Sequence, residues 1–245
     1  MSVFLEARWR DLVMLNWIID SAVLARRVPV GTELDLFEGQ CFISLVAFRF
    51  QDTRVCGIPV PGHRDFEEIN LRFYVKRQEG GETRRGVVFI KEIVPRAAIT
   101  FVARVLYGEP YVTMPTASEV RADAAGKTAN YSWHQNERTH FVSIECGPKT
   151  AVPAPGSHEA FIAEHYWGYT ARGAATSEYR VVHPPWALRA TRTVSCAVDA
   201  ALLYGSEFST VLSGPPNSAF LAEGSEVKVH TGRKFKCREL VPGPR

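Results

Sequence analysis

The chain lacks paired cysteines, a long apolar run and an excess of charge of one sign. Its five cysteines, Cys41, Cys56, Cys146, Cys196 and Cys237, are isolated and never spaced as Cys-x-x-Cys. This pattern argues against a disulfide framework and a structural zinc site, and it favours a reducing, cytoplasmic location.

Membranes and nucleic acids are not expected partners. No apolar stretch approaches the roughly 20 residues that a membrane-spanning helix needs. Charged residues occupy the first dozen positions, including Glu6 and Asp11, so we expect no signal peptide. The 29 Lys and Arg residues are spread along the chain against 26 Asp and Glu, which leaves no concentrated basic patch for phosphates.

Short β-branched and aromatic runs, separated by turn-forming residues, make up most of the chain. This predicts a mainly β fold, α+β at the margin, in one domain over residues 1–231 with a flexible tail over 232–245. With 245 residues, 46% of them hydrophobic, such a domain can bury a large core. The clearest helix is expected over residues 96–107, with Gly108 as its left-handed terminator.

Residues 86–96 hold two charges, Lys91 and Glu92, in a strand that is otherwise apolar on both faces. A buried charge costs free energy unless it is paired or faces polar surroundings. The two residues are therefore either satisfied structural partners or part of the wall of a polar cavity.

We expect residues 66–77 and 83–94 to form a hairpin with a loop over 78–82. The even positions of its first strand are polar or amphipathic, and the loop length places Glu68 opposite Glu92. Adjacent carboxylates need a cation, a shared proton or a ligand. Alternatively, this face is exposed to solvent and neutralised by Arg72 and Lys76. A one-residue change of register would turn Lys91 onto it.

Several segments resemble a known family: Trp9–Asn16, Val28–Asp35, Phe66–Val75 and Tyr179–Trp186. They are similar to an uncharacterised bacterial family with the domain of unknown function 2071 (YqjF-like), which is remotely related to the acetoacetate decarboxylase superfamily. The resemblance implies an antiparallel β-barrel or cone with a few peripheral helices and a cavity for a small molecule.

The resemblance also bears on chemistry. The decarboxylases form a Schiff base between a lysine and the substrate ketone, assisted by arginine and glutamate. Arg10 corresponds to their site arginine, but Arg96 stands where they place the lysine. A guanidinium stays protonated and cannot act as the amine nucleophile. Lys91 on the neighbouring strand is the alternative amine, although a lysine there more commonly pairs with a carboxylate.

We therefore predict a small-molecule-binding protein that acts as a lyase-like enzyme on a small carboxylate or keto compound, without the family lysine. The predicted catalytic residues are Glu68 and Glu92, and the predicted substrate-binding residues are Arg10, Arg72, Lys91 and Arg96. The alternative is a non-catalytic ligand-binding or structural barrel.

The ligand is expected to be anionic, and a homo-oligomer is a candidate assembly. No cofactor or metal is expected, because the sequence has no nucleotide fingerprint and His158 and His165 are not spaced to share one helix face.

Overall fold

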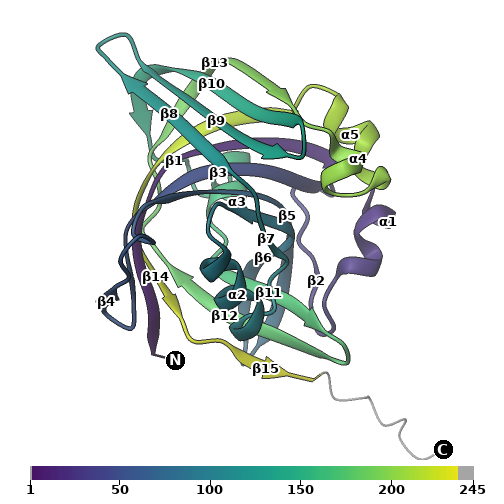
Figure 1. Cartoon of the computed structure of the whole chain (residues 1–245). Helices are drawn as coiled ribbons and strands as arrows, with labels where there is room; N and C mark the ends of the chain where they lie inside the picture. The colour runs from purple at the N-terminus through teal and green to yellow at the C-terminus, as the bar shows by residue number, and fades with distance from the viewer. Residues whose placement is uncertain (1, 237–245) are drawn as a thin grey trace, which may run out of the picture.

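The computed structural model describes residues 2–236, and its strands join in one continuous sheet (Figure 1). The predicted mainly β fold is thereby confirmed. The strands are β1 (Val3–Ile19), β2 (Glu33–Leu34), β3 (Cys41–Val55), β4 (Ile58–Pro59), β5 (Phe66–Glu79), β6 (Glu82–Val94), β7 (Tyr111–Thr113), β8 (Thr116–Ala122), β9 (Lys127–Gln135), β10 (Arg138–Ala151), β11 (Trp167–Arg172), β12 (Ala175–Val182), β13 (Leu188–Ala197), β14 (Ser218–His230) and β15 (Arg233–Phe235). The helices are α1 (Ser21–Leu24), η1 (Ala25–Arg27), α2 (Ala97–Leu106), α3 (His158–Ala163), α4 (Ala200–Leu203), η2 (Ser206–Phe208) and α5 (Ser209–Ser213).

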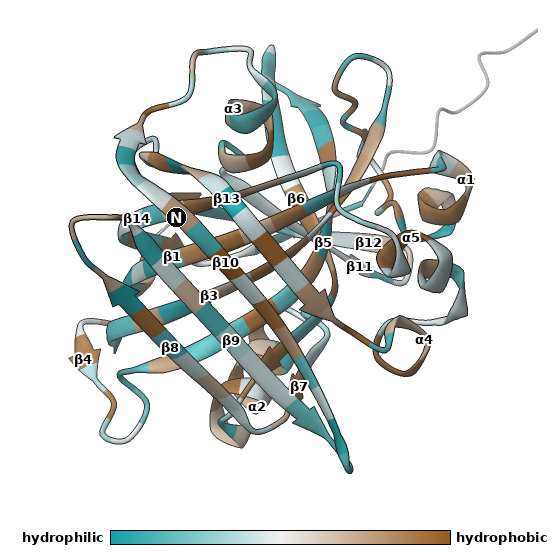
Figure 2. Cartoon of the chain, turned by 90° about the horizontal axis from the view of Figure 1, so that it is seen from above, coloured by the Kyte–Doolittle hydropathy of each residue, from teal (hydrophilic) through white to brown (hydrophobic). Residues whose placement is uncertain are grey.

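A ring of strands closes within this sheet. Its order is β12-β11-β6-β5-β3-β1-β14, and β14 pairs back to β12 through Val181 with Val229 and Val182 with Lys228. From β14 the sheet continues through β13, β10, β9 and β8. These strands cross over β1 and β3, as the view from above shows (Figure 2). The sheet therefore forms both a ring and a second layer.

Two apolar cores follow from the alternation of side chains along the strands. On β1, Val13 and Leu15 belong to the core that also contains Tyr131 and Trp133 of the crossing layer. Met14, between them in sequence, belongs to the second core, which contains residues of the ring strands and α3. Because both faces of β1 are covered, its central residues are apolar on both faces.

The expected helix over residues 96–107 is α2, and Gly108 ends it with a φ of +73°. The Gly108 amide donates to the carbonyl oxygens of Ala103 and Arg104, both at 3.1 Å. A side chain at residue 108 would be strained at this φ and would also meet the Arg172 guanidinium. No helix within residues 2–236 is long and apolar enough to span a membrane.

The β5–β6 hairpin differs from the prediction in its turn and in its register. The turn is only Gly80-Gly81, with φ of +60° and +82°, so the strands extend to Glu79 and Glu82. Two positive φ values suit a tight hairpin turn, for which glycine is the natural residue. Glu92 pairs with Asn70 and not with Glu68.

A β-bulge in β6 then decides which charge faces the ring interior. The register shifts between Leu71, which pairs with Lys91, and Arg72, which pairs with Phe89, so Ile90 is the extra residue. In an unbroken strand Phe89 and Lys91 would share a face, because side chains alternate with a period of two. The bulge turns Glu92 onto the face of Phe89 in place of Lys91.

The C-terminal boundary of the folded part also needs correction. Residues 233–235, expected in a flexible tail, form β15 and pair with Glu178, Ser177 and Thr176 of β12. The Arg233 Nε donates to the buried Glu178 carboxylate at 2.9 Å. Residues 237–245 of the predicted tail lie outside the described residues.

Replacing Arg233 with alanine is expected to lower the free energy of unfolding by about 1 kcal/mol, because a half-exposed ion pair to Glu178 is lost. Urea denaturation measures the effect. Lys234→Ala is the matched control, since Lys234 is its exposed neighbour in β15. Equal destabilisation by both variants would show that the ion pair does not hold β15.

Candidate functional site

A cavity of about 210 Å³ is enclosed largely by the ring strands and α2. Most of its lining is apolar. The polar side chains that line it are gathered mainly on the hairpin β5–β6 and on the segments that follow α2 and α3: Glu68, Arg72, Glu92, Glu109, Tyr111 and His165, with Tyr179 of β12 beside them. The cavity therefore combines an apolar interior with a compact group of ionisable residues.

Three carboxyl groups meet in this cavity. Glu68 lies on β5, Glu92 on β6 and Glu109 between α2 and β7, and each is at most 3% exposed. Glu92 pairs in parallel register with Tyr111, two residues beyond Glu109, which brings the segment after α2 beside the hairpin. Residues that are distant in sequence thus place three acids in one buried space.

Burial raises the pKa of all three groups, because a charged carboxylate is poorly solvated there. The pKa is raised to about 7 for Glu68 and to about 8 for Glu109. For Glu92 burial is again the main cause, and the charges of Glu109 and Glu68 raise its pKa further, well above 4.5. At neutral pH the cluster therefore retains protons that ordinary glutamates have lost.

Hydrogen bonds distinguish the three acids. Glu68 accepts from the Tyr111 hydroxyl at 2.8 Å and from the Asn70 amide at 3.0 Å. Both bonds favour its ionised form, as does the charge of Arg72. One oxygen of Glu92 and both oxygens of Glu109 are buried without a hydrogen bond of acceptable geometry, although the hydroxyls of Thr170 and Tyr179 favour ionised Glu109. Buried polar atoms of this kind are the ones a ligand can satisfy.

Arg72 is the cation that lines the cavity beside the acids. Its guanidinium donates to the Ile162 carbonyl oxygen at 3.4 Å and lies 5.7 Å from the ring centroid of Tyr74. Its Nε is buried without a partner. Arg72 can therefore offer a donor to an oxygen of a bound molecule.

His165 is held in the neutral form. Burial lowers its pKa to about 4, and its Nε2 lies 3.2 Å from the Asp35 carboxylate, which also accepts from Arg85 at 2.6 Å. A neutral imidazole that donates through Nε2 leaves Nδ1 as an acceptor, and Nδ1 has no partner here.

The structure places Glu68, Glu92 and Arg72 in one cavity, but it places Lys91 and Arg96 elsewhere. Because of the bulge in β6, Lys91 points away from the cavity and donates to the Leu203 carbonyl oxygen. Arg96 is exposed at the start of α2. Neither residue lines the cavity.

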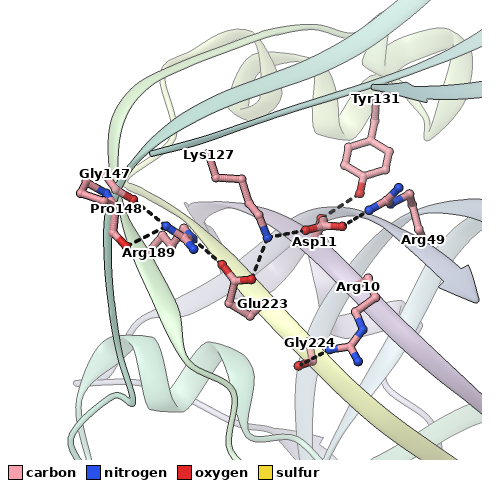
Figure 3. A network of polar contacts seen from close by, with 10 residues as sticks. All are labelled: Arg10, Asp11, Arg49, Lys127, Tyr131, Gly147, Pro148, Arg189, Glu223 and Gly224. Carbon is pink, nitrogen blue, oxygen red and sulfur yellow. Dashed lines mark hydrogen bonds and ion pairs between the residues drawn. The ribbon is translucent and has the colours of Figure 1, made fainter. Parts of the chain in front are cut away.

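Arg10 is also outside the cavity. Its neighbour Trp9 lines the cavity, and Arg10 therefore lies on the other face of β1, where it donates to the Gly224 carbonyl oxygen at 3.4 Å. It lies beside a polar network on that side of the sheet (Figure 3). The network joins Asp11, Arg49, Lys127, Tyr131, Arg189 and Glu223. A left-handed φ of +56° at Asp11, within a register shift between β1 and β3, returns Leu12 to the cavity side of the strand.

Sequence reasoning missed Glu109, Tyr111, His165 and Tyr179. The local signal at Glu109 is its place between the helix-terminating Gly108 and Pro110, because a proline restricts the backbone of the residue before it. No local pattern marks His165, whose place in the cavity depends on the contact with Asp35.

Two solved structures are similar to this chain over nearly its whole length. The enduracididine biosynthesis enzyme MppR complexed with pyruvate has a TM-score of 0.67 at 14% identity, with 96% of this chain and 91% of that chain covered. Acetoacetate decarboxylase from Legionella pneumophila subsp. pneumophila str. Philadelphia 1 has a TM-score of 0.67 at 12% identity, with 96% and 88% covered. The fold is therefore acetoacetate decarboxylase-like.

The chain belongs to the DUF2071 family, described as an uncharacterized conserved protein, whose model matches residues 6–226. The uncharacterized protein YqjF of Bacillus subtilis (strain 168) is 27% identical over 198 residues, which is 78% of this chain and 79% of YqjF. Both findings confirm the resemblance seen in the sequence.

Proposed function

We propose that this protein binds a small carbonyl compound in the cavity and, as a lyase-like enzyme, moves protons at the carbon next to the carbonyl without a Schiff base. The observation that carries the proposal is the group of three buried carboxyls, two of which, Glu92 and Glu109, have unpartnered oxygens, in a cavity whose described lining includes no lysine. Acids with raised pKa values are suited to general acid–base catalysis near neutral pH.

Glu68 is the base in this proposal. Its pKa of about 7 gives it a large ionised fraction at neutral pH, and its hydrogen bonds from Tyr111 and Asn70 hold the carboxylate in place. A base whose pKa lies near the working pH is ionised in a large fraction of the molecules and still has a high affinity for a proton. Glu68 takes a proton from the carbon, and the electrons of the broken C–H bond form a carbon–carbon double bond.

Glu92 is the acid. It holds its proton because burial and its acidic neighbours raise its pKa, and it gives that proton to the carbonyl oxygen as the enol forms. Protonated Glu109 can hydrogen-bond to the same oxygen or to a second polar group. Arg72 can donate hydrogen bonds to a carboxylate of the ligand, which supports the predicted anionic ligand.

The test measures incorporation of solvent deuterium into the methyl group of pyruvate by proton NMR, together with treatment of the mixture with borohydride. We expect catalysed exchange and no reduced lysine adduct. A trapped adduct would overturn the proposed mechanism. Binding of pyruvate without exchange would favour the alternative, a non-catalytic ligand-binding protein.

A reducing cellular location also belongs to this proposal. It is supported by the four cysteines within residues 2–236, which are free in the structure. Measuring free thiols with a maleimide reagent in protein isolated without reductant tests it, and full labelling after unfolding is the expected result.

A further inference from the structure

The charged groups of the cavity wall are concentrated on two adjacent strands of the ring, whereas the strands that follow them contribute an almost entirely apolar lining. The carboxyls Glu68 and Glu92 and the cation Arg72 lie on the adjacent strands β5 and β6. The lining residues of β1, β3 and β14, which are the next strands around the ring, are apolar except for Thr53. A ligand with its reacting group at β5 and β6 therefore places its remainder against an apolar wall.

Strand pairing makes this apolar wall continuous. Val181 of β12 pairs with Val229 of β14, Val229 also pairs with Leu5 of β1, and Leu5 also pairs with Val55 of β3. All of these residues line the cavity. Directly opposed residues of neighbouring strands lie side by side on one face of a sheet. They form an unbroken apolar row around this part of the ring.

Helix α2 extends the same surface. Its lining residues Ala98, Ile99, Val102 and Ala103 are all apolar, and Tyr107 at its end lies 5.6 Å from Phe4 between ring centroids. A compact ligand such as pyruvate, held at the acids, would leave this surface uncovered. Uncovered apolar surface in a cavity favours a ligand that can displace water from it.

The size of the cavity limits the apolar group. An engineered cavity of roughly 150 Å³ lined by apolar side chains binds benzene. The cavity of about 210 Å³ therefore has room for an apolar group of about that size in addition to a small polar head.

We propose that the natural substrate is a carbonyl compound with an apolar tail, with its carbonyl at Glu68 and Glu92 and its tail against β1, β3, β14 and α2. This inference rests on the proposed function for the carbonyl end. The proposed placement of the tail depends only on which residues line the cavity.

Calorimetric titration with pyruvate, α-ketobutyrate, α-ketovalerate and α-ketocaproate tests the tail. We expect the dissociation constant to fall about fourfold with each methylene, the factor that corresponds to ~0.8 kcal/mol per buried methylene. A constant or weakening affinity along the series would overturn the inference.

Ala103→Leu, which fills the cavity from α2, should abolish the gain in affinity from pyruvate to the longest acid. Val105→Leu is the matched control, because Val105 lies on the same helix and is 59% exposed. If Ala103→Leu does not fold, the titration series on the unaltered protein still decides whether the apolar tail contributes to binding. If the gain in affinity from pyruvate to α-ketocaproate were the same in both variants, the tail would bind elsewhere and the inference would be overturned.

The two proposals can fail separately. If longer acids bind more tightly but none exchanges deuterium, the tail inference stands and the proposed chemistry fails. If pyruvate exchanges deuterium but longer acids bind no better, the chemistry stands and the tail inference fails.

Discussion

Replacing Glu68 with glutamine is expected to lower the rate of deuterium exchange into pyruvate by about 10²- to 10⁴-fold, the range typical of a lost general base. Glutamine keeps the shape of the side chain and can still accept a hydrogen bond from Tyr111, but it cannot remove a proton from carbon. The loss should therefore appear in the exchange rate measured by NMR at saturating pyruvate.

Glu67→Gln is the matched control for this variant. Glu67 precedes Glu68 on β5 but faces the other side, where it accepts from Thr116 and Ser118 at 2.8 Å. Its amide oxygen can accept from one of these hydroxyls and its amide nitrogen can donate to the other, so exchange should proceed at nearly the unaltered rate. If Glu68→Gln retained full activity, Glu68 could not be the base.

Raising the pH from 6.5 to 8 is expected to destabilise the fold. The folded protein keeps Glu109 protonated up to a pKa of about 8, whereas the unfolded chain has already ionised this group above 4.5. The folded state therefore binds more protons in this interval, and the free energy of unfolding falls as pH rises. Glu109 alone accounts for about 2 kcal/mol between these two pH values.

The pH interval begins at 6.5 because, below this pH, His165 and His183 change the free energy of unfolding in the opposite direction. Burial lowers the pKa of His165 and of His183 to about 4, so protons taken up by the unfolded chain reduce stability as pH falls below 6.5. Most of the histidine effect lies below pH 6.5, so urea titrations at pH 6.5 and pH 8 report mainly on the acids.

Glu109→Gln provides the comparison for the pH effect. A neutral amide does not ionise, so the variant should lose about 2 kcal/mol less stability than the unaltered protein over the same interval. Equal losses in the two proteins would mean that Glu109 ionises in the folded state as it does in the unfolded chain.

More of the fold than of the site could be predicted from the sequence. Alternating apolar residues and turn signals predict strands, and the four resembling segments identify the family to which the chain belongs. Helix α2 and its terminator Gly108 follow from local patterns. Local patterns do not predict the closing pair between β12 and β14, because it joins residues that are far apart in the chain.

The site depended on two irregularities that a regular strand pattern does not contain. The extra residue Ile90 exchanges the faces of Lys91 and Glu92, and the left-handed Asp11 separates the face of Arg10 from that of Leu12 and Met14. The resemblance to a distant lysine-dependent family places Arg10 in the site only by its position along the chain. A bulge changes the face of every residue beyond it, so position alone does not fix where a side chain points.

Local sequence patterns also do not predict that Glu109 belongs to the site. Its contribution arises only when the segment after α2 packs beside the hairpin, where its charge raises the pKa of Glu92. The predicted pair of acids becomes a group of three through this tertiary contact.

The proposed acid–base chemistry depends on glutamates that retain their protons near neutral pH. An NMR titration of the glutamate side-chain carboxyl carbons tests this most directly. Single Glu-to-Gln variants assign the signals of Glu68, Glu92 and Glu109. We predict midpoints near pH 7 for Glu68 and near pH 8 for Glu109, with Glu92 protonated well above its ordinary value of 4.5. Titration of all three groups near pH 4.5 would contradict the account.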